Sequence, residues 1–247
     1  MKVYKLTSAS GMTHQDYKWS LPKDGKPGEW HRANGEGTEL CSDGYLHWYH
    51  HPMLAPLLDP IHACIGPTAR LWEAETRGEI LDDNGLKGGS KGLRLIREIE
   101  LPAFSTEQQM AFGIYCALEV CNNAAFAKWA NAWLDGSDRS AAAAWAAANA
   151  AWAARDAEAA ARAAAWAGAA WAAAGTAAWA AEAAAWAAAG TAAWAAWAAG
   201  AAARAAAWAA AEAAWAAGAA ARAAAWAGID PTKLLITCAE KACKFKP

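Results

Sequence analysis

Hydrophobic and polar positions alternate in short runs over roughly the first hundred residues, and this pattern predicts β-strands. Turn residues and charged residues separate the runs. Pro52–Leu58 is expected to form one or two helical turns, with Pro52 at the first helical position. The predicted strands are Met1–Leu6, Tyr45–His50, Ala69–Glu75 and Leu93–Leu101.

Glycine, proline and charged residues mark the connections between these strands. Lys23–Gly37 is expected to be a loop, and Asp83-Asn84-Gly85 is a turn signal. Gly85–Gly92 contains several glycines and two lysines, but it lacks the spacing of a phosphate-binding loop. It is therefore predicted to be a flexible hairpin loop.

Apolar residues recur at helical spacing after Ser105. Ser105 and Gln108 fit a capping box, which predicts a helix beginning at that point. A second helical stretch is expected over Phe126–Leu134, and Gly136 is expected to end it. Near the C-terminus, Asp230-Pro231 predicts an N-cap followed by proline at the first position of a short helix.

Residues 140–228 consist almost entirely of alanine and tryptophan. They hold eleven of the seventeen tryptophans, eight charged residues, and no Leu, Ile, Val or Phe. Alanine is the best helix former, so this region is predicted to be helical. Literal repeats such as GAAARAAAWA, at Gly200–Ala209 and Gly218–Ala227, lie eighteen residues apart and therefore share one helix face.

Seven tryptophans of this region fall in one stripe, about 80° wide on a helical projection. Trp145, Trp152 and Trp166 form another stripe that is out of phase with the first. The opposite face is almost pure alanine. The seven tryptophans, which are the predicted oligomer interface, are Trp179, Trp186, Trp194, Trp197, Trp208, Trp215 and Trp226.

Two architectures compete for residues 176–228. They form either a single long helix or stacked short helices with turns at Gly190, Gly200 and Gly218. The tryptophans before and after these glycines keep the same angular position on the helical projection. This favours the long helix, because a turn at a glycine would shift that position. A stripe of exposed tryptophans is unfavourable in water, so we expect a homo-oligomer to cover it. The alternative is that the stripe is buried within the same chain as an intramolecular core.

The expected fold is therefore α+β. It has a β-rich domain over residues 1–103, connecting helices over 104–136, an Ala/Trp helical repeat region over 137–228, and a short C-terminal helix over 229–247. A chain of 247 residues is long enough for one large or two small cores.

Charge and cysteine content limit the partners and the cellular location that we expect. A net charge of −2 argues against nucleic acid as a partner. The N-terminal sequence does not resemble a signal peptide, and the six cysteines suit reduced cytosolic thiols, so a cytoplasmic location is expected. The uncharged run Ala183–Ala203 is long enough for a membrane span, but alanine drives insertion weakly, so no membrane partner is expected.

No catalytic motif has diagnostic spacing, and no cofactor is expected. His47, His50, His51 and His62 cluster between two cysteines, Cys41 and Cys64, but their spacing matches no standard zinc signature, so no metal site is predicted. Arginine precedes tryptophan by four residues at three places in the tail. This spacing favours self-contained cation–π pairs over a ligand site.

The N-terminal region resembles an uncharacterised family of small bacteriophage-encoded proteins. The likeness rests on L-C-x-x-G-x-L-H at 40–47, P-I-H-A at 60–63 and L-W-E-x-E at 71–75, together with an alanine-rich helical tail. It covers about the first 135 residues. The resemblance implies a phage origin and action inside a bacterial cell, and it transfers no catalytic residues. The tryptophan density of this tail departs from the family pattern.

Small accessory phage proteins often act against host defences, sometimes by sequestering nucleotide signals. The favoured hypothesis is thus a non-enzymatic binding protein that captures a small nucleotide-type ligand or a host defence component. The alternatives are an oligomeric scaffold that docks a protein partner and a nucleotide hydrolase that uses the histidines. The predicted ligand-binding residues are His47, Tyr49, His62 and Trp72, with Arg70 or Arg94 as the anion partner.

Overall fold

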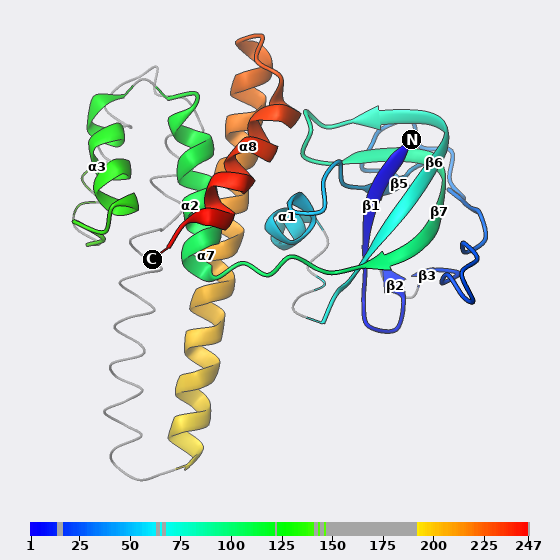
Figure 1. The fold of residues 1–247 in the computed structure, drawn as a ribbon, viewed down its shortest axis with the longest axis horizontal. Coiled ribbons are helices and arrows are strands. Elements are labelled where there is room, and N and C mark those ends of the chain that lie inside the picture. Colours follow the sequence, from blue (N-terminus) through cyan, green and yellow to red (C-terminus); the bar gives the residue numbers. More distant parts are fainter. Residues whose placement is uncertain are drawn as a thin grey trace. The chain divides into compact units, whose positions relative to one another are not determined.

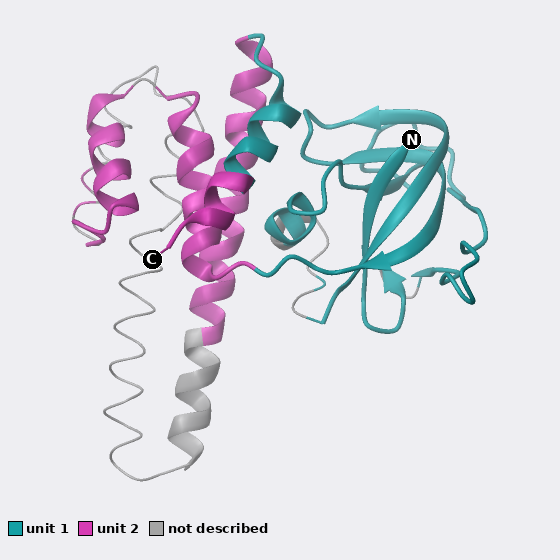
Figure 2. Ribbon diagram, in the orientation of Figure 1, with its two compact units in different colours: residues 1–103, 228–239 teal, residues 104–227, 240–247 magenta. Residues whose placement is uncertain are grey.

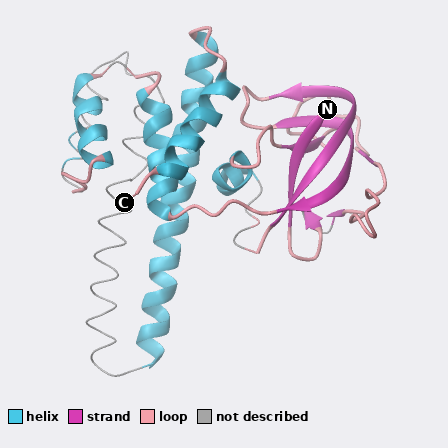
Figure 3. Cartoon of the chain, in the orientation of Figure 1, coloured by secondary structure: helices cyan, strands magenta, loops and turns pink. Residues whose placement is uncertain are grey.

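The structure is a computed structural model that describes residues 1–13, 17–62, 65, 68–121, 123–140, 143, 146 and 192–246; the side chains of 60–62 and 192–202 lie outside the description. The described residues combine an antiparallel sheet with helices, as expected for an α+β chain (Figure 3). They divide into two compact units (Figure 2). Unit 1 comprises residues 1–103 and 228–239, and unit 2 comprises residues 104–227 and 240–247.

Unit 1 is built on a five-stranded antiparallel sheet in the described part of the chain. The strand order is β1-β6-β7-β4, and β5 also pairs with β7 (Figure 1). The two-residue strands β2 and β3 form a separate pair. The strands are β1 (Lys2–Thr7), β2 (Met12–Thr13), β3 (Tyr17–Lys18), β4 (His31–Arg32), β5 (Leu46–Trp48), β6 (Arg70–Asp82) and β7 (Gly88–Ile99).

Each predicted strand of this region is present, although the bounds differ. The strand predicted at Ala69–Glu75 extends to Asp82 as β6, and the predicted loop Lys23–Gly37 contains the short strand β4. The helical turns predicted at Pro52–Leu58 form helix α1 (Leu54–His62), which buries Leu54, Leu57 and Leu58. The helix begins two residues after Pro52, so the prediction that Pro52 is its first residue was wrong.

The glycine-rich segment Gly85–Gly92 is not a flexible loop, so that prediction was wrong. The turn covers only Asp83–Lys87, and β7 begins at Gly88. A Cβ atom at Gly88 would lie 2.1 Å from the Trp48 indole, so the missing side chain makes room for a large ring against the sheet. Glycine serves close approach here rather than flexibility.

Tryptophans from separate strands and loops meet in the core of unit 1. Trp19, Trp48 and Trp72 pack with Val3 and Leu95. The buried Trp72 indole donates a hydrogen bond of 2.9 Å to the Thr7 hydroxyl on β1. This bond satisfies a polar group that would be costly to bury alone.

Unit 2 begins with two helices whose starts follow the predicted capping signals. Helix α2 (Thr106–Leu118) has the complete capping box of Ser105 and Gln108. Helix α3 (Ala124–Leu134) is capped by Asn123, whose side-chain oxygen accepts from the Phe126 N–H at 3.0 Å. The Gln108 side chain also donates to the Cys243 carbonyl at 3.1 Å, which ties the C-terminal end of the chain to α2.

Helix α7 (Ala192–Trp226) is one continuous helix of 35 residues, about 52 Å long. It passes through Gly200 and Gly218 without a turn, so the alternative with turns at these two glycines was wrong. Gly190, with the rest of residues 147–191, lies outside the described residues, as do Trp145, Trp152, Trp166, Trp179 and Trp186.

The alanine face of α7 is the buried face. Ala209, Ala213, Ala216 and Ala220 lie at intervals of three and four residues and are almost fully buried. Trp208, Trp215 and Trp226, about a third of a turn around the helix from these alanines, are 59%, 55% and 90% exposed. These three tryptophans are therefore not an intramolecular core. Trp194 and Trp197 lie on α7, but their side chains are outside the description.

The last helix, α8 (Pro231–Lys244), begins at the predicted proline. The Asp230 carboxylate accepts from the Lys233 N–H at 3.1 Å, as expected of an N-cap. Cys238 and Cys243 are both free thiols, in agreement with the prediction that they do not form a bridge. No helix among the described residues is long and apolar enough to span a membrane.

Gly113 sets the distance between α2 and α7. A Cβ atom there would lie 2.9 Å from the Ala213 carbonyl oxygen and 3.0 Å from the Ala213 Cα. We expect Gly113→Val to lower the free energy of unfolding by about 1–3 kcal/mol, because the backbones must separate. The measurement is urea denaturation followed by circular dichroism. Ala125→Val, at an exposed position of α3, is the control and is expected to cost about 0.6 kcal/mol. Equal losses in both variants would contradict the close packing.

Candidate ligand site

A cavity of about 760 Å³ opens within unit 1, beside the tryptophan core. Its walls come from five segments: β1, the β2–β3 pair with Trp19, the residues directly after β4, the segment from Cys41 to His47, and the turn between β6 and β7. This volume is within the range of small-molecule sites. The lining residues are Lys5, Thr13, Tyr17, Trp19, Ala33, Asn34, Cys41, Ser42, Asp43, Tyr45, Leu46, His47 and Lys87.

Lys5 is the unusual residue of this cavity because it is a lysine on the core side of a strand. It lies between Val3 and Thr7, and alternate residues of a strand share a face. Its relative exposure is 9%. The ammonium group donates to the His47 carbonyl at 2.7 Å and lies 5.1 Å from the centre of the Trp19 ring.

Burial weakens the charged form of Lys5. Loss of hydration, and then the nearby positive charge of Lys87, lower the pKa of Lys5 from its ordinary value to about 7. Among the described residues, no carboxylate forms an ion pair with Lys5. A perturbed, desolvated lysine that lines a cavity is a marker of a functional site.

Lys87 brings a second cation to the cavity from the β6–β7 turn. Its ammonium group donates to the Cys41 sulfur at 3.2 Å. Asp43 also lines the cavity, and its carboxylate accepts from the Gly37 N–H at 3.3 Å. The wall therefore offers two lysines and one carboxylate, together with the Asn34 amide, which suits an anion that also carries hydrogen-bonding groups.

Aromatic rings form the remaining wall. The ring centres of Tyr17 and Trp19 lie 5.2 Å apart, and those of Trp19 and His31 lie 4.8 Å apart. Burial lowers the pKa of His31, and Glu29 only partly opposes this effect. The Trp19 indole donates to the Thr13 hydroxyl at 2.8 Å, which fixes the ring plane. Such rings provide flat surfaces against which a planar ligand can stack.

Of the five predicted ligand-binding residues whose side chains are described, His47 alone lines this cavity. Its ring hydrogen-bonds the Leu40 carbonyl. Tyr49 is buried, and its backbone pairs with that of Tyr4. His62 is the last residue of α1, and its side chain is outside the description.

The other three predicted residues lie apart from the cavity. Trp72 is buried in the core, as described above. The Arg70 guanidinium donates two hydrogen bonds to Glu98 and lies 4.4 Å from the Trp72 ring centre. The Arg94 guanidinium donates two to Glu75. Both arginines therefore already hold a carboxylate.

Four residues that line the cavity were not predicted from the sequence: Lys5, Lys87, Trp19 and Tyr45. A signal existed for Lys5, since strand alternation places it, unlike Lys2, on the same face as Val3 and Thr7, and lysine is rare in such a core-facing position. Lys87 gave no comparable signal, because its position depends on the length of the β6–β7 turn. Among the described residues no group of three or more histidine, cysteine or acidic side chains is placed to hold a metal ion.

Comparisons with protein-family models, with curated proteins and with solved structures gave no match for this chain.

The depressed pKa of Lys5 predicts a specific dependence of stability on pH. Between about pH 7 and pH 10 the unfolded state holds a proton on Lys5 that the folded state has lost, so stability rises with pH there by about 1.4 kcal/mol per unit. Below pH 7 both states are protonated and this slope vanishes. We expect Lys5→Met to remove the slope between pH 7.5 and 9.5.

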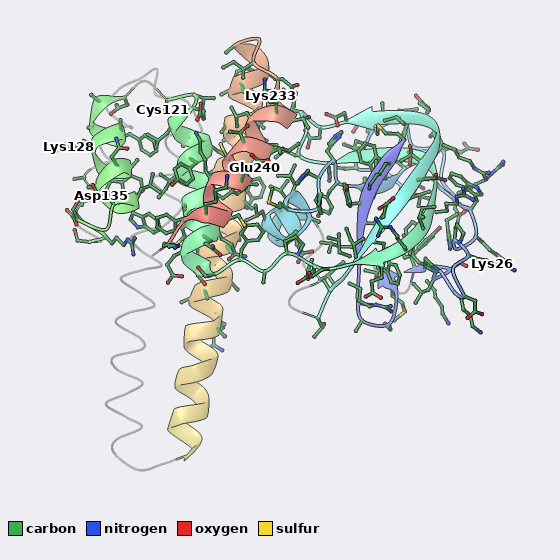
Figure 4. All side chains as sticks on the ribbon, viewed as in Figure 1. Lys26, Cys121, Lys128, Asp135, Lys233 and Glu240 are labelled. Carbon is green, nitrogen blue, oxygen red and sulfur yellow. The ribbon has the colours of Figure 1, made fainter. Side chains whose placement is uncertain are left out.

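The measurement is the free energy of urea unfolding at each pH, followed by fluorescence. Lys26 is the matched control because it is exposed on the loop before β4 (Figure 4). Lys26→Met should keep the slope. A wild-type slope that Lys5→Met leaves unchanged would contradict the assignment.

Proposed function

We propose that unit 1 is a binding module that captures a small nucleotide-type molecule in the Lys5 cavity without turning it over. The observation that carries this proposal is the buried Lys5 ammonium near Lys87, with Trp19 and Tyr45 lining the same cavity. A nucleotide presents an anionic phosphate and a planar base, and these two groups match the two chemistries of the wall.

The phosphate is assigned to the lysine side of the cavity. Lys87 approaches from a turn, and among the described residues its ammonium hydrogen-bonds only the Cys41 thiol, so it can add an oxygen ligand at little cost. An anion would also provide the buried Lys5 with the counter-charge that the described residues do not provide. The base is assigned to the Tyr17–Trp19 side, where the partly exposed Tyr17 ring offers the stacking surface, since Trp19 is only 3% exposed.

The biological setting belongs to the same proposal. The resemblance to phage-encoded proteins suggests the cytoplasm of a bacterial host, where sequestering a nucleotide signal would counter a defence system. A protein that captures a ligand needs a binding cavity but no catalytic group. The polar residues of this cavity suit such binding. The scaffold and hydrolase hypotheses remain as outcomes of the tests below.

Ligand binding is tested by equilibrium dialysis with adenosine and guanosine monophosphates and their cyclic forms. We expect at least one to bind, and we expect Lys87→Gln to weaken its affinity about tenfold, because a charge-assisted hydrogen bond is lost. Lys26→Gln is the control and should bind as the wild type does. Absence of binding at millimolar concentration, or equal effects of both substitutions, would refute the nucleotide assignment.

Capture and catalysis are separated by the fate of the ligand. The bound nucleotide should be recovered intact after the protein is denatured by heat. Recovery of an altered nucleotide would favour the hydrolase hypothesis instead.

We propose further that the tryptophan face of α7 packs against a second copy of this chain. The support is the exposure of Trp208, Trp215 and Trp226 along one side of a regular helix. Exposed indoles in a row are a typical interaction surface. A second copy fits because the alternation of large indoles and small alanines repeats along the face, so the indoles of one helix can occupy the spaces above the alanines of another.

Mass photometry at nanomolar concentration and light scattering at micromolar concentration test this assembly. We expect a dimer or larger species for the wild type and a monomer for the triple variant Trp208→Gln/Trp215→Gln/Trp226→Gln. Ile80→Ser/Ile229→Ser removes exposed apolar side chains elsewhere, so it should leave the assembly intact. A folded wild-type monomer at micromolar concentration would refute the proposal.

A further inference from the structure

Lys5 has a chemical property that binding alone does not use. Its primary amine is buried, yet it lines a cavity that is open to solvent on one side. The amine donates one hydrogen bond, of 2.7 Å, to the His47 carbonyl oxygen. Asp43 lines the same cavity, but among the described residues no carboxylate forms an ion pair with Lys5. The ammonium form is therefore weakly stabilised, and the neutral amine has an electron pair that can react.

The groups around this amine favour its neutral form. Lys87 acts on it as a second cation, and the centre of the Trp19 ring lies 5.1 Å from it, while Leu46 adds apolar surface to the same cavity. A lysine that is desolvated or placed next to another cation is the arrangement by which proteins activate an amine as a nucleophile. The titratable side chains that line the same cavity are Tyr17, Cys41, Asp43, Tyr45, His47 and Lys87.

We propose that Lys5 is a carbonyl-reactive amine, which condenses reversibly with small aldehydes or ketones that enter the cavity. The Lys5 nitrogen attacks the carbonyl carbon, and a C–N bond forms as the C–O π bond opens. Both N–H protons then leave with the carbonyl oxygen as water, and the product is an imine. The step consumes no oxidant or reductant, and water reverses it.

The preferred ligand class follows from the walls of the cavity. A carbonyl group on an aromatic ring would place the ring beside Trp19 and Tyr45, and an anionic substituent would meet Lys87. This inference rests on the proposed function, since it uses the same cavity, but it adds a second chemistry to it. Pyridoxal 5′-phosphate combines an aldehyde, an aromatic ring and a phosphate, so it is a suitable probe.

The experiment is imine trapping on the full chain. The protein is incubated with pyridoxal 5′-phosphate, reduced with borohydride, digested, and mapped by peptide mass spectrometry from pH 6 to pH 10. At pH 7.5 we expect Lys5 to carry about tenfold or more adduct than the exposed Lys26 and Lys128, because its amine is largely neutral there (Figure 4). The labelling of Lys5 should reach half its maximum near pH 7.

Two controls make the result specific to the folded cavity. Lys5→Arg should abolish the dominant adduct while leaving the labelling of Lys26 unchanged. Most small domains unfold in about 8 M urea. The wild-type protein at roughly this urea concentration should therefore lose the selectivity for Lys5. This second control needs no variant, so it holds even where Lys5→Arg does not fold. Adduct spread evenly over exposed lysines in the native protein would overturn the inference.

The outcomes separate this inference from the proposed function. Nucleotide binding in dialysis without a selective adduct at Lys5 would overturn the reactive amine alone. A selective adduct at Lys5 without nucleotide binding would overturn the nucleotide assignment and leave the reactive amine supported.

Discussion

The burial of one lysine side chain is the constraint on which the account of unit 1 depends. A strand places Lys5 on the same face as Val3 and Thr7, which face a core of tryptophans. The charged form of such a group is costly to desolvate, so the site must either supply an acceptor or favour the neutral amine. The His47 carbonyl supplies one acceptor, and the cavity leaves the remaining positions for a ligand. Anion capture and amine reactivity are two consequences of this one arrangement.

Unit 2 follows a different principle, because small residues rather than large ones are buried along its longest helix. Alanines of α7 face α2, and Gly113 lets the two backbones approach. The bulky packing of this unit comes from α2, α3 and the C-terminal residues, where Phe126, Trp133 and Phe245 gather. Trp208, Trp215 and Trp226 are thereby left exposed on α7. This distribution explains why a region so rich in tryptophan adds little indole surface to its own described core.

Local signals in the sequence predicted the elements well, and long-range contacts account for what they missed. The capping box at Ser105 and the Asp230-Pro231 start depend only on neighbouring residues, and both are present. Gly88 was misassigned because its role depends on Trp48, forty residues away. Arg70 and Arg94 were chosen by residue type as anion partners, but cross-strand carboxylates on the β6–β7 hairpin already hold them. The cavity was not predictable, since its walls come from five separate segments.

The most direct test of the central claim is a nuclear magnetic resonance titration of lysine side chains labelled with carbon-13 at Cε. Lys5→Arg assigns the signal, and the chemical shift of each lysine then reports its own protonation. The account predicts that the Lys5 signal titrates with a midpoint near pH 7. A midpoint near pH 10, where ordinary lysines titrate, would contradict the buried, weakly charged amine from which the ligand site and its chemistry were derived.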